Sequence, residues 1–90
     1  MSGKKNVIME MEEKRSLADV AHFLRDLADK LEGNQLTLQQ GNDEIKLTLP
    51  DPITLEFELE EKHKKGRVKR QLEIELEWYP DEEEGSISLV

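Results

Sequence analysis

The sequence contains no cysteine, and this absence excludes a disulfide framework, a thiolate metal site and a thiol nucleophile. It is compatible with a reducing compartment, so we expect a cytoplasmic protein. Aromatic residues make up only 4% of the chain, including a single tryptophan. None of them lies among the basic residues 62–70, where aromatic side chains would be needed to stack nucleobases.

Long apolar runs are also missing. No stretch approaches the roughly 20 apolar residues of a membrane span, and residues 1–6 are mostly polar, unlike the start of a signal peptide. Acidic residues dominate, since 21 Asp and Glu against 13 Lys and Arg give a net charge of −8. Because nucleic acid and anionic membranes are polyanions, this charge disfavours both as main partners.

Ninety residues are enough for one domain, and we predict a single domain over residues 1–80 with an acidic, flexible tail over residues 81–90. Between Leu17 and Leu31 the apolar residues recur at i, i+3, i+4 and i+7, which predicts an amphipathic helix. Ser16 followed by Asp19 resembles a capping box, and Gly33-Asn34 supplies a left-handed residue to end the helix.

The remaining apolar residues alternate with polar ones at a period of two, which predicts half-buried strands. The alternating segments are residues 7–11, 36–39, 45–49, 53–60 and 68–78. Turns are expected at residues 41–43 and 62–66, and Pro50-Asp51-Pro52 separates the two resulting hairpins. We therefore predict an α+β fold in which one amphipathic helix packs on a mainly antiparallel five-stranded sheet, in the order β-α-β-β-β-β. Residues 86–90 either add an edge strand or stay loose.

The register of the second hairpin can be predicted from charge. One register places Glu60 opposite Arg67 and Glu58 opposite Lys69, so that opposite charges meet. A shift of four residues places Glu58 opposite Glu73 instead, and directly opposed like charges are destabilising. Charge pairing therefore favours the first register.

The apolar content of the strands bears on assembly. Seventeen large apolar side chains, from Val7 to Trp78, lie on the inward phase of the predicted strands. A helix is only about 10–12 Å across, whereas five strands span roughly 24 Å. Either the sheet curls strongly or a second copy covers the remainder, and we favour a homodimer.

Four groups of polar or aromatic residues are candidates for function. The glutamate rows on residues 56–60 and 73–77 could bind a cation or act as an acid–base pair, but we favour the interpretation that they form a solvated strand face. The basic island contains the candidate partner-binding residues Lys64, Lys65 and Arg67, although such a hairpin tip also balances nearby glutamates. Trp78 is either core or dimer interface, or an exposed anchor for a partner.

His22 and Asp26 lie one turn apart on the predicted helix, where they could supply two metal ligands, although an exposed helix face is the ordinary interpretation. The sequence has no nucleophile–base pair, no phosphate-cradling glycine loop and no dinucleotide fingerprint. We therefore predict no catalytic residue, no metal site and no cofactor.

Three segments together resemble a known family. They are L-A-D-V-A-H-F-L-R-D-L-A-D-K-L-E-G at residues 17–33, I-T-L-E-F-E-L-E at residues 53–60 and L-E-I-E-L-E-W at residues 72–78. In this order and spacing they resemble the amphi-Trp domain family, small prokaryotic proteins with amphipathic strands and a tryptophan near the end. The resemblance implies a stand-alone cytoplasmic domain and brings no known activity, cofactor or catalytic residue.

These observations lead to a functional hypothesis with two alternatives. The hypothesis is a non-enzymatic protein-interaction domain that self-associates through its apolar sheet face, with a further protein partner possible. The first alternative is an acidic structural or stress-related accessory protein. The second is a small hydrolase or isomerase that uses carboxylates on the sheet.

Overall fold

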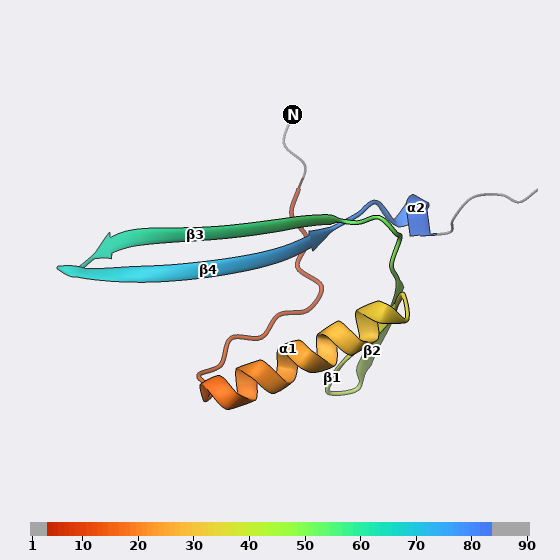
Figure 1. The fold of residues 1–90 in the computed structure, drawn as a ribbon, viewed down its shortest axis with the longest axis horizontal. Helices are drawn as coiled ribbons and strands as arrows, with labels where there is room; N and C mark the ends of the chain where they lie inside the picture. Colours follow the sequence, from red (N-terminus) through yellow and green to blue (C-terminus); the bar gives the residue numbers. More distant parts are fainter. Residues whose placement is uncertain (1–3, 84–90) are drawn as a thin grey trace, which may run out of the picture. The chain divides into compact units, whose positions relative to one another are not determined.

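The computed structural model describes residues 4–83, which form two helices and four strands (Figure 1). The elements are α1 (Leu17–Glu32), β1 (Gln35–Gln40), β2 (Asp43–Thr48), β3 (Thr54–Lys64), β4 (Arg67–Glu77) and α2 (Pro80–Glu83). The chain divides into two compact units, Met1–Leu47 and Thr48–Val90, which are described in turn. The predicted single domain over residues 1–80 stays a prediction.

Helix α1 confirms the helical prediction, including both of its ends. The backbone N–H of Asp19 donates to Ser16 Oγ at 3.0 Å, which satisfies one of the free N–H groups at the start of the helix. At the other end the N–H of Asn34 donates to the carbonyl of Leu31 at 3.1 Å. Asn34 takes a φ of 60°, a left-handed conformation that turns the chain out of the helix.

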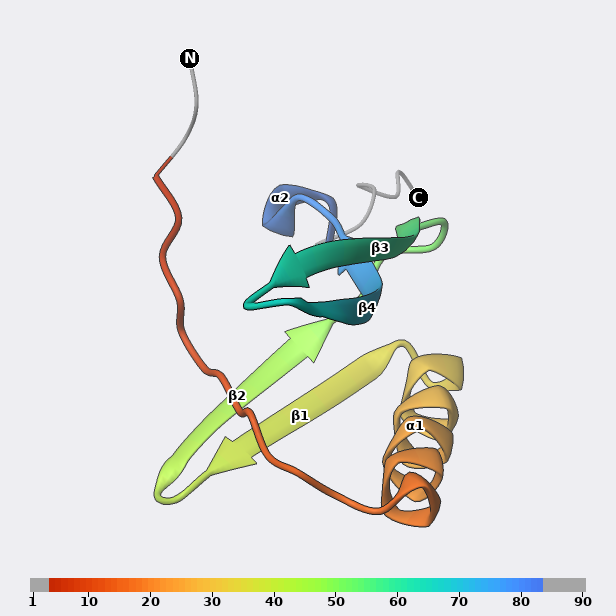
Figure 2. The ribbon, with the colours of Figure 1, turned by 90° about the vertical axis from the view of Figure 1, so that its left-hand side faces the viewer.

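Strands β1 and β2 form the first predicted hairpin, joined by the two-residue loop Gly41-Asn42. Gly41 has a φ of 59°, which is the positive value that the first position of a type II′ hairpin turn requires. Helix α1 packs beside β1 in the same unit (Figure 2).

The predicted first strand at residues 7–11 is wrong, because the structure has no strand there. The segment crosses the β1–β2 hairpin instead (Figure 2), and Gln40 Nε2 donates to the backbone carbonyl of Glu10 at 2.9 Å. Val7 and Ile8 share a hollow with Ile45 and other residues of the hairpin. Alternating apolar residues report only that a segment has one sheltered side, whereas a strand also requires a ladder of backbone hydrogen bonds.

Strands β3 and β4 form the second hairpin, with eleven residues in each strand (Figure 1). They are joined by Lys65-Gly66, whose φ angles are 50° and 73°. Positive φ at both central residues defines a type I′ turn, whose twist matches that of the strands it connects. The turn is shorter than the expected loop over residues 62–66.

This two-residue turn corrects the predicted register. Lys64 pairs with Arg67, so that Glu58 lies opposite Glu73 and not opposite Lys69. The register is shifted by four residues from the one that charge pairing favours. The reason is physical: turn geometry fixes the register of a hairpin, and repulsion between exposed glutamates on flexible side chains is too weak to override it.

The fold is α+β, as predicted, but the sheet prediction is wrong. Among the described residues the strands form two separate two-stranded sheets, β1–β2 and β3–β4, in place of one five-stranded sheet. Leu49, which follows β2, is the one buried large hydrophobic residue of the described part, with 6% of its surface exposed. The possible edge strand at residues 86–90 and most of the acidic tail lie outside the described residues.

Candidate interaction surface

One face of the β3–β4 hairpin is entirely apolar along its half nearest α2. Three directly opposed pairs make up this apolar hairpin face, namely Leu55–Leu76, Phe57–Ile74 and Leu59–Leu72. Because successive side chains alternate between the two faces of a strand, all six point to the same side. The sequence predicted this face, although with different cross-strand partners.

The apolar hairpin face is open to solvent. The exposed fractions are 64% for Phe57, 66% for Leu59 and 58% for Leu72, and only Leu76 is half-buried. Isolated apolar side chains on a surface are ordinary, but a contiguous patch is not. A two-stranded hairpin is also marginally stable in water without a second layer. This face is therefore the strongest candidate for an interaction surface.

Trp78 lies directly after the last residue of β4, Glu77, and is half-buried. It is thus neither a fully enclosed core residue nor a fully exposed anchor. Its position is two residues from Leu76, which places both in the same alternating phase. In the sequence pattern Trp78 is therefore in phase with the apolar hairpin face, one residue beyond the end of β4.

The opposite face of the hairpin carries a glutamate cluster that only the observed register assembles. Glu56 lies opposite Glu75 and Glu58 opposite Glu73, and the carboxylate oxygens of Glu56, Glu75 and Glu77 lie within 4.8 Å of one another. A hydrogen bond between Glu56 and Glu77, which needs a shared proton, raises the pKa of Glu56. The corresponding contact with Glu60 raises the pKa of Glu58.

Most of these glutamates are exposed and only Glu60 and Glu73 are half-buried, which limits what they can do chemically. Acid–base catalysis by two carboxylates requires environments that differ, usually through burial of one of them. No charged side chain among residues 4–81 is buried. Exposed acidic clusters are also common without a bound cation. We therefore assign neither a catalytic nor a metal role to the cluster.

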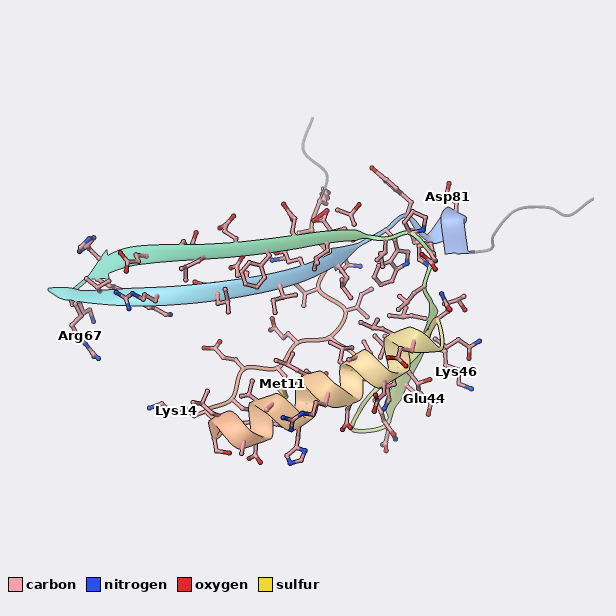
Figure 3. The ribbon with its side chains drawn as sticks, in the orientation of Figure 1. Met11, Lys14, Glu44, Lys46, Arg67 and Asp81 are labelled. Atoms are coloured by element: carbon pink, nitrogen blue, oxygen red, sulfur yellow. The ribbon has the colours of Figure 1, made fainter. Side chains whose placement is uncertain are left out.

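The far end of the hairpin is a basic tip, where the structure brings the three predicted partner-binding cations together (Figure 3, which labels Arg67). Its residues are Lys62, Lys64, Lys65, Arg67 and Lys69, of which four line a shallow hollow together with Val68. Lys62 faces Lys69 and Lys64 faces Arg67 across the strands.

Only part of the positive charge near this tip is neutralised locally. Lys62 Nζ lies 3.2 Å from Glu60 Oε1, and Arg70 Nε lies 2.6 Å from Glu61 Oε2. No carboxylate of the described side chains lies within 4 Å of the charged atoms of the other four tip residues, Lys64, Lys65, Arg67 and Lys69. The basic tip thus keeps a net positive charge on an acidic protein.

Two further features of the first unit bear on possible binding sites. A hollow of about 490 Å³ lies between residues 5–10 and the β1–β2 hairpin, with Leu38, Ile45 and Leu47 in its lining. The sequence gives no sign of this hollow, because the alternation at residues 7–11 predicts a strand. His22 and Asp26 are both exposed on α1, and no third ligand joins them among the described residues.

Together these features define a class: a small α+β protein built from two amphipathic hairpins and one amphipathic helix. The chain belongs to the Amphi-Trp domain family, whose model matches residues 2–89, essentially its whole length. The match confirms the resemblance drawn from the three segments, and it spans both compact units. No curated protein and no solved structure matches the chain. Neither helix within residues 4–83 is long and apolar enough to cross a membrane.

Proposed function

We propose that this protein is a non-enzymatic protein-interaction domain that self-associates through its apolar hairpin face. One observation carries the proposal: five of the six large side chains of that face are more than half exposed, with Phe57 at 64% and Leu59 at 66%. We also propose a cytoplasmic location, in line with a cysteine-free composition.

The energetic argument rests on the hydrophobic effect. Complete burial of a Leu, Ile or Phe side chain contributes about 1.5–3 kcal/mol relative to leaving it in water. A second copy offers a surface of the same kind and size, and two identical patches can meet about a twofold axis. The same contact gives each marginal hairpin the second layer that it needs. A homodimer therefore accounts for the exposure of the face.

The exposed patch favours this proposal over the accessory-protein alternative. An accessory role that depends on solvation by acidic residues requires a polar surface. The apolar hairpin face contradicts that requirement, because its six side chains form a continuous strip along two strands. The enzyme alternative receives no support from the glutamates of the hairpin, because none of them is buried.

The proposal is tested by measuring the mass of the protein in solution. We expect the wild type to be a dimer at micromolar concentration in sedimentation equilibrium. The Leu59→Asp variant is expected to be monomeric, because it places a charge within the apolar hairpin face. The matched control is Leu17→Asp, since Leu17 is 87% exposed at the start of α1, where an acidic residue is favourable.

Circular dichroism of both variants checks that α1 remains folded. A wild-type protein that is a compact monomer at these concentrations would overturn the proposal. An equal loss of the dimer in Leu59→Asp and Leu17→Asp would also overturn it, because the two sites lie on different elements.

A further inference from the structure

The basic tip carries two features that lower the stability of the free hairpin. Across the strands Lys62 faces Lys69 and Lys64 faces Arg67. Like charges that face each other directly across a pair of strands are destabilising. In addition, Lys65 has a φ of 50° at the first position of the type I′ turn, a conformation that asparagine and glycine adopt with less strain. Such local conflicts are expected at functional sites, where a ligand can offset them.

The cations of the basic tip also lack a counter-ion within the described part of the chain. Four of them, Lys64, Lys65, Arg67 and Lys69, have no carboxylate oxygen within 4 Å of their charged nitrogen atoms. The same four side chains line a hollow of about 360 Å³ beside the turn, together with Val68. The hollow therefore collects positive charge that is not neutralised locally, which attracts anions.

We infer that the basic tip binds a compact phosphate-bearing anion, either free diphosphate or the diphosphate group of a small molecule. Phosphate oxygens accept short, charge-assisted hydrogen bonds from lysine and arginine side chains. Arg67 offers a planar fork of donors that can contact two oxygens of one phosphate, and Lys64 opposite it offers a compact point charge. An anion held between this pair replaces the repulsion of two cations by two attractions.

The spacing of the cations fits an anion of this size. Side chains that face each other across two antiparallel strands start about 5 Å apart, and two residues along a strand add about 7 Å. A patch of about 5 by 7 Å therefore contains the starting points of four side chains, those of Lys62, Lys64, Arg67 and Lys69. Their long, flexible stems let the charged groups converge on one or two phosphate groups.

The surroundings of the basic tip favour a compact anion over an extended polyanion. The nearest glutamate on the same face is Glu60, which is paired with Lys62 and lies four residues from Lys64, about 14 Å along β3. Charges in water are screened beyond about 8 Å at physiological ionic strength. Beyond Glu60 the same face carries five more glutamates, which are Glu56, Glu58, Glu73, Glu75 and Glu77. A diphosphate at the turn avoids them, whereas a nucleic acid or a membrane along the hairpin meets them.

The anion site does not depend on the proposed self-association. Lys64 is in phase with Glu58 on β3, and Arg67 is in phase with Glu73 on β4. Both cations therefore lie on the glutamate face, opposite the apolar hairpin face. A second copy that covers the apolar hairpin face leaves them open to a ligand.

Isothermal titration calorimetry of the full chain with sodium diphosphate, at pH 7 and a salt concentration of about 0.15 M, tests the inference. The tip variant is Lys64→Gln/Arg67→Gln, which removes one opposed pair of cations. The matched control is Lys14→Gln/Lys46→Gln, which removes the same charge outside the hairpin, at two positions that Figure 3 labels. Circular dichroism checks that each variant is folded.

We expect the wild type to bind diphosphate with a dissociation constant below about 1 mM. The tip variant should bind about tenfold more weakly, because it loses two charge-assisted contacts. The control should stay within about threefold of the wild type.

ADP, which carries the same diphosphate group, separates the two sources of the anion. We expect it to bind as diphosphate does, because residues 62–70 contain no Phe, Tyr or Trp to stack its base. Tighter binding of ADP would also support the site and would assign it to a nucleotide.

A further variant links the strain at the turn to the ligand. Lys65→Asn places a residue that tolerates positive φ at the first position of the type I′ turn. It should raise the midpoint of urea unfolding, followed by the fluorescence of Trp78, and weaken diphosphate binding about threefold. A lysine with a purely structural role would not lower the stability of the fold and strengthen binding together.

The outcomes are distinct from those that test self-association. The inference is overturned if the wild type does not bind diphosphate at about 1 mM, or if the tip variant or Lys65→Asn binds it as the control does. Tighter binding of a short DNA duplex or of phosphatidylglycerol vesicles than of diphosphate also overturns it. Leu59→Asp should bind diphosphate as the wild type does. A wild type that is monomeric and binds diphosphate overturns the self-association alone.

Discussion

The two hairpins of this protein have the same design and differ in what covers their apolar side chains. The β1–β2 hairpin has α1 beside it and residues 5–10 across it, and Leu38 is 37% exposed. The β3–β4 hairpin is nearly twice as long, and its Leu59 is 66% exposed. A covered hairpin can be stable within its own unit, whereas an uncovered one needs a further surface, which we propose a second copy supplies.

The largest effect is expected from breaking the turn of the uncovered hairpin. Gly66 has a φ of 73°, so Gly66→Ala places an L side chain in the left-handed region at a cost of about 1–2 kcal/mol. Urea unfolding followed by the fluorescence of Trp78, the only tryptophan, measures the effect in this unit.

The control for this turn is Gly33→Ala. Gly33 has a φ of −89°, and an added Cβ would meet its nearest neighbour, the carbonyl oxygen of Lys30, at an ordinary 3.6 Å. It should change stability much less than Gly66→Ala does. Equal effects of the two substitutions would show that the turn does not hold the register.

The next largest effect is expected in α1, the helix that packs beside the β1–β2 hairpin. Ser16→Ala removes the hydroxyl that accepts from the N–H of Asp19 and should destabilise α1 by about 1 kcal/mol. Circular dichroism measures the lost helix, and Ser16→Asp should restore it because aspartate also caps helices. If Ser16→Ala and Ser16→Asp unfold alike, the cap does not stabilise the helix.

A smaller effect is expected where residues 5–10 cross the β1–β2 hairpin. Gln40→Glu cannot donate to the carbonyl of Glu10, and the loss of one exposed hydrogen bond costs about 0.5 kcal/mol. Hydrogen–deuterium exchange of a peptide covering residues 4–12 should become faster. Gln39→Glu is the matched control, and equally fast exchange in both variants would remove Gln40 as the attachment.

The smallest expected effect is a dependence of the free energy of unfolding on pH, caused by the glutamates of the β3–β4 hairpin. Contact with Glu77 and with Glu60 raises the folded-state pKa of Glu56 and of Glu58 above their ordinary value of 4.5. The folded hairpin therefore binds more protons than the unfolded chain in that range. The contribution of Glu56 and Glu58 to the stability of the folded protein is most favourable below pH 4.5. It is lost as the pH rises through their folded-state pKa.

The measurement compares the unfolding free energy of the wild type and of Glu56→Gln/Glu58→Gln at pH 7 and at pH 4.5, with Trp78 fluorescence as the signal. The variant should gain stability over the wild type at pH 7 and lose this advantage at pH 4.5. A difference between the two proteins that does not change with pH would contradict the shared proton at these glutamates.

Local features were well predicted from the sequence. Ser16 and Asn34 mark the two ends of the helix as expected, because capping depends on residues only three or four positions apart. The apolar and acidic faces of β3 and β4 were also predicted, since alternation depends only on strand geometry. The candidate cations Lys64, Lys65 and Arg67 were correctly grouped because they surround one turn.

Contacts between residues far apart in the sequence were predicted wrongly. Glu58 was expected to pair with Lys69 and pairs with Glu73, since a type I′ turn at Lys65-Gly66 outweighs exposed charge. The glutamate cluster at Glu56, Glu75 and Glu77 follows from this register and could not be foreseen without it.

The amino-acid sequence of this protein therefore specified its helix, the amphipathic character of its hairpins and its family, because each depends on short-range pattern. The folded structure was needed to learn that residues 7–11 cross a hairpin without joining its sheet, and that the strands form two sheets and not one. The reason is that alternation shows which side of a segment is sheltered, whereas backbone hydrogen bonding with another part of the chain decides which segments become neighbouring strands.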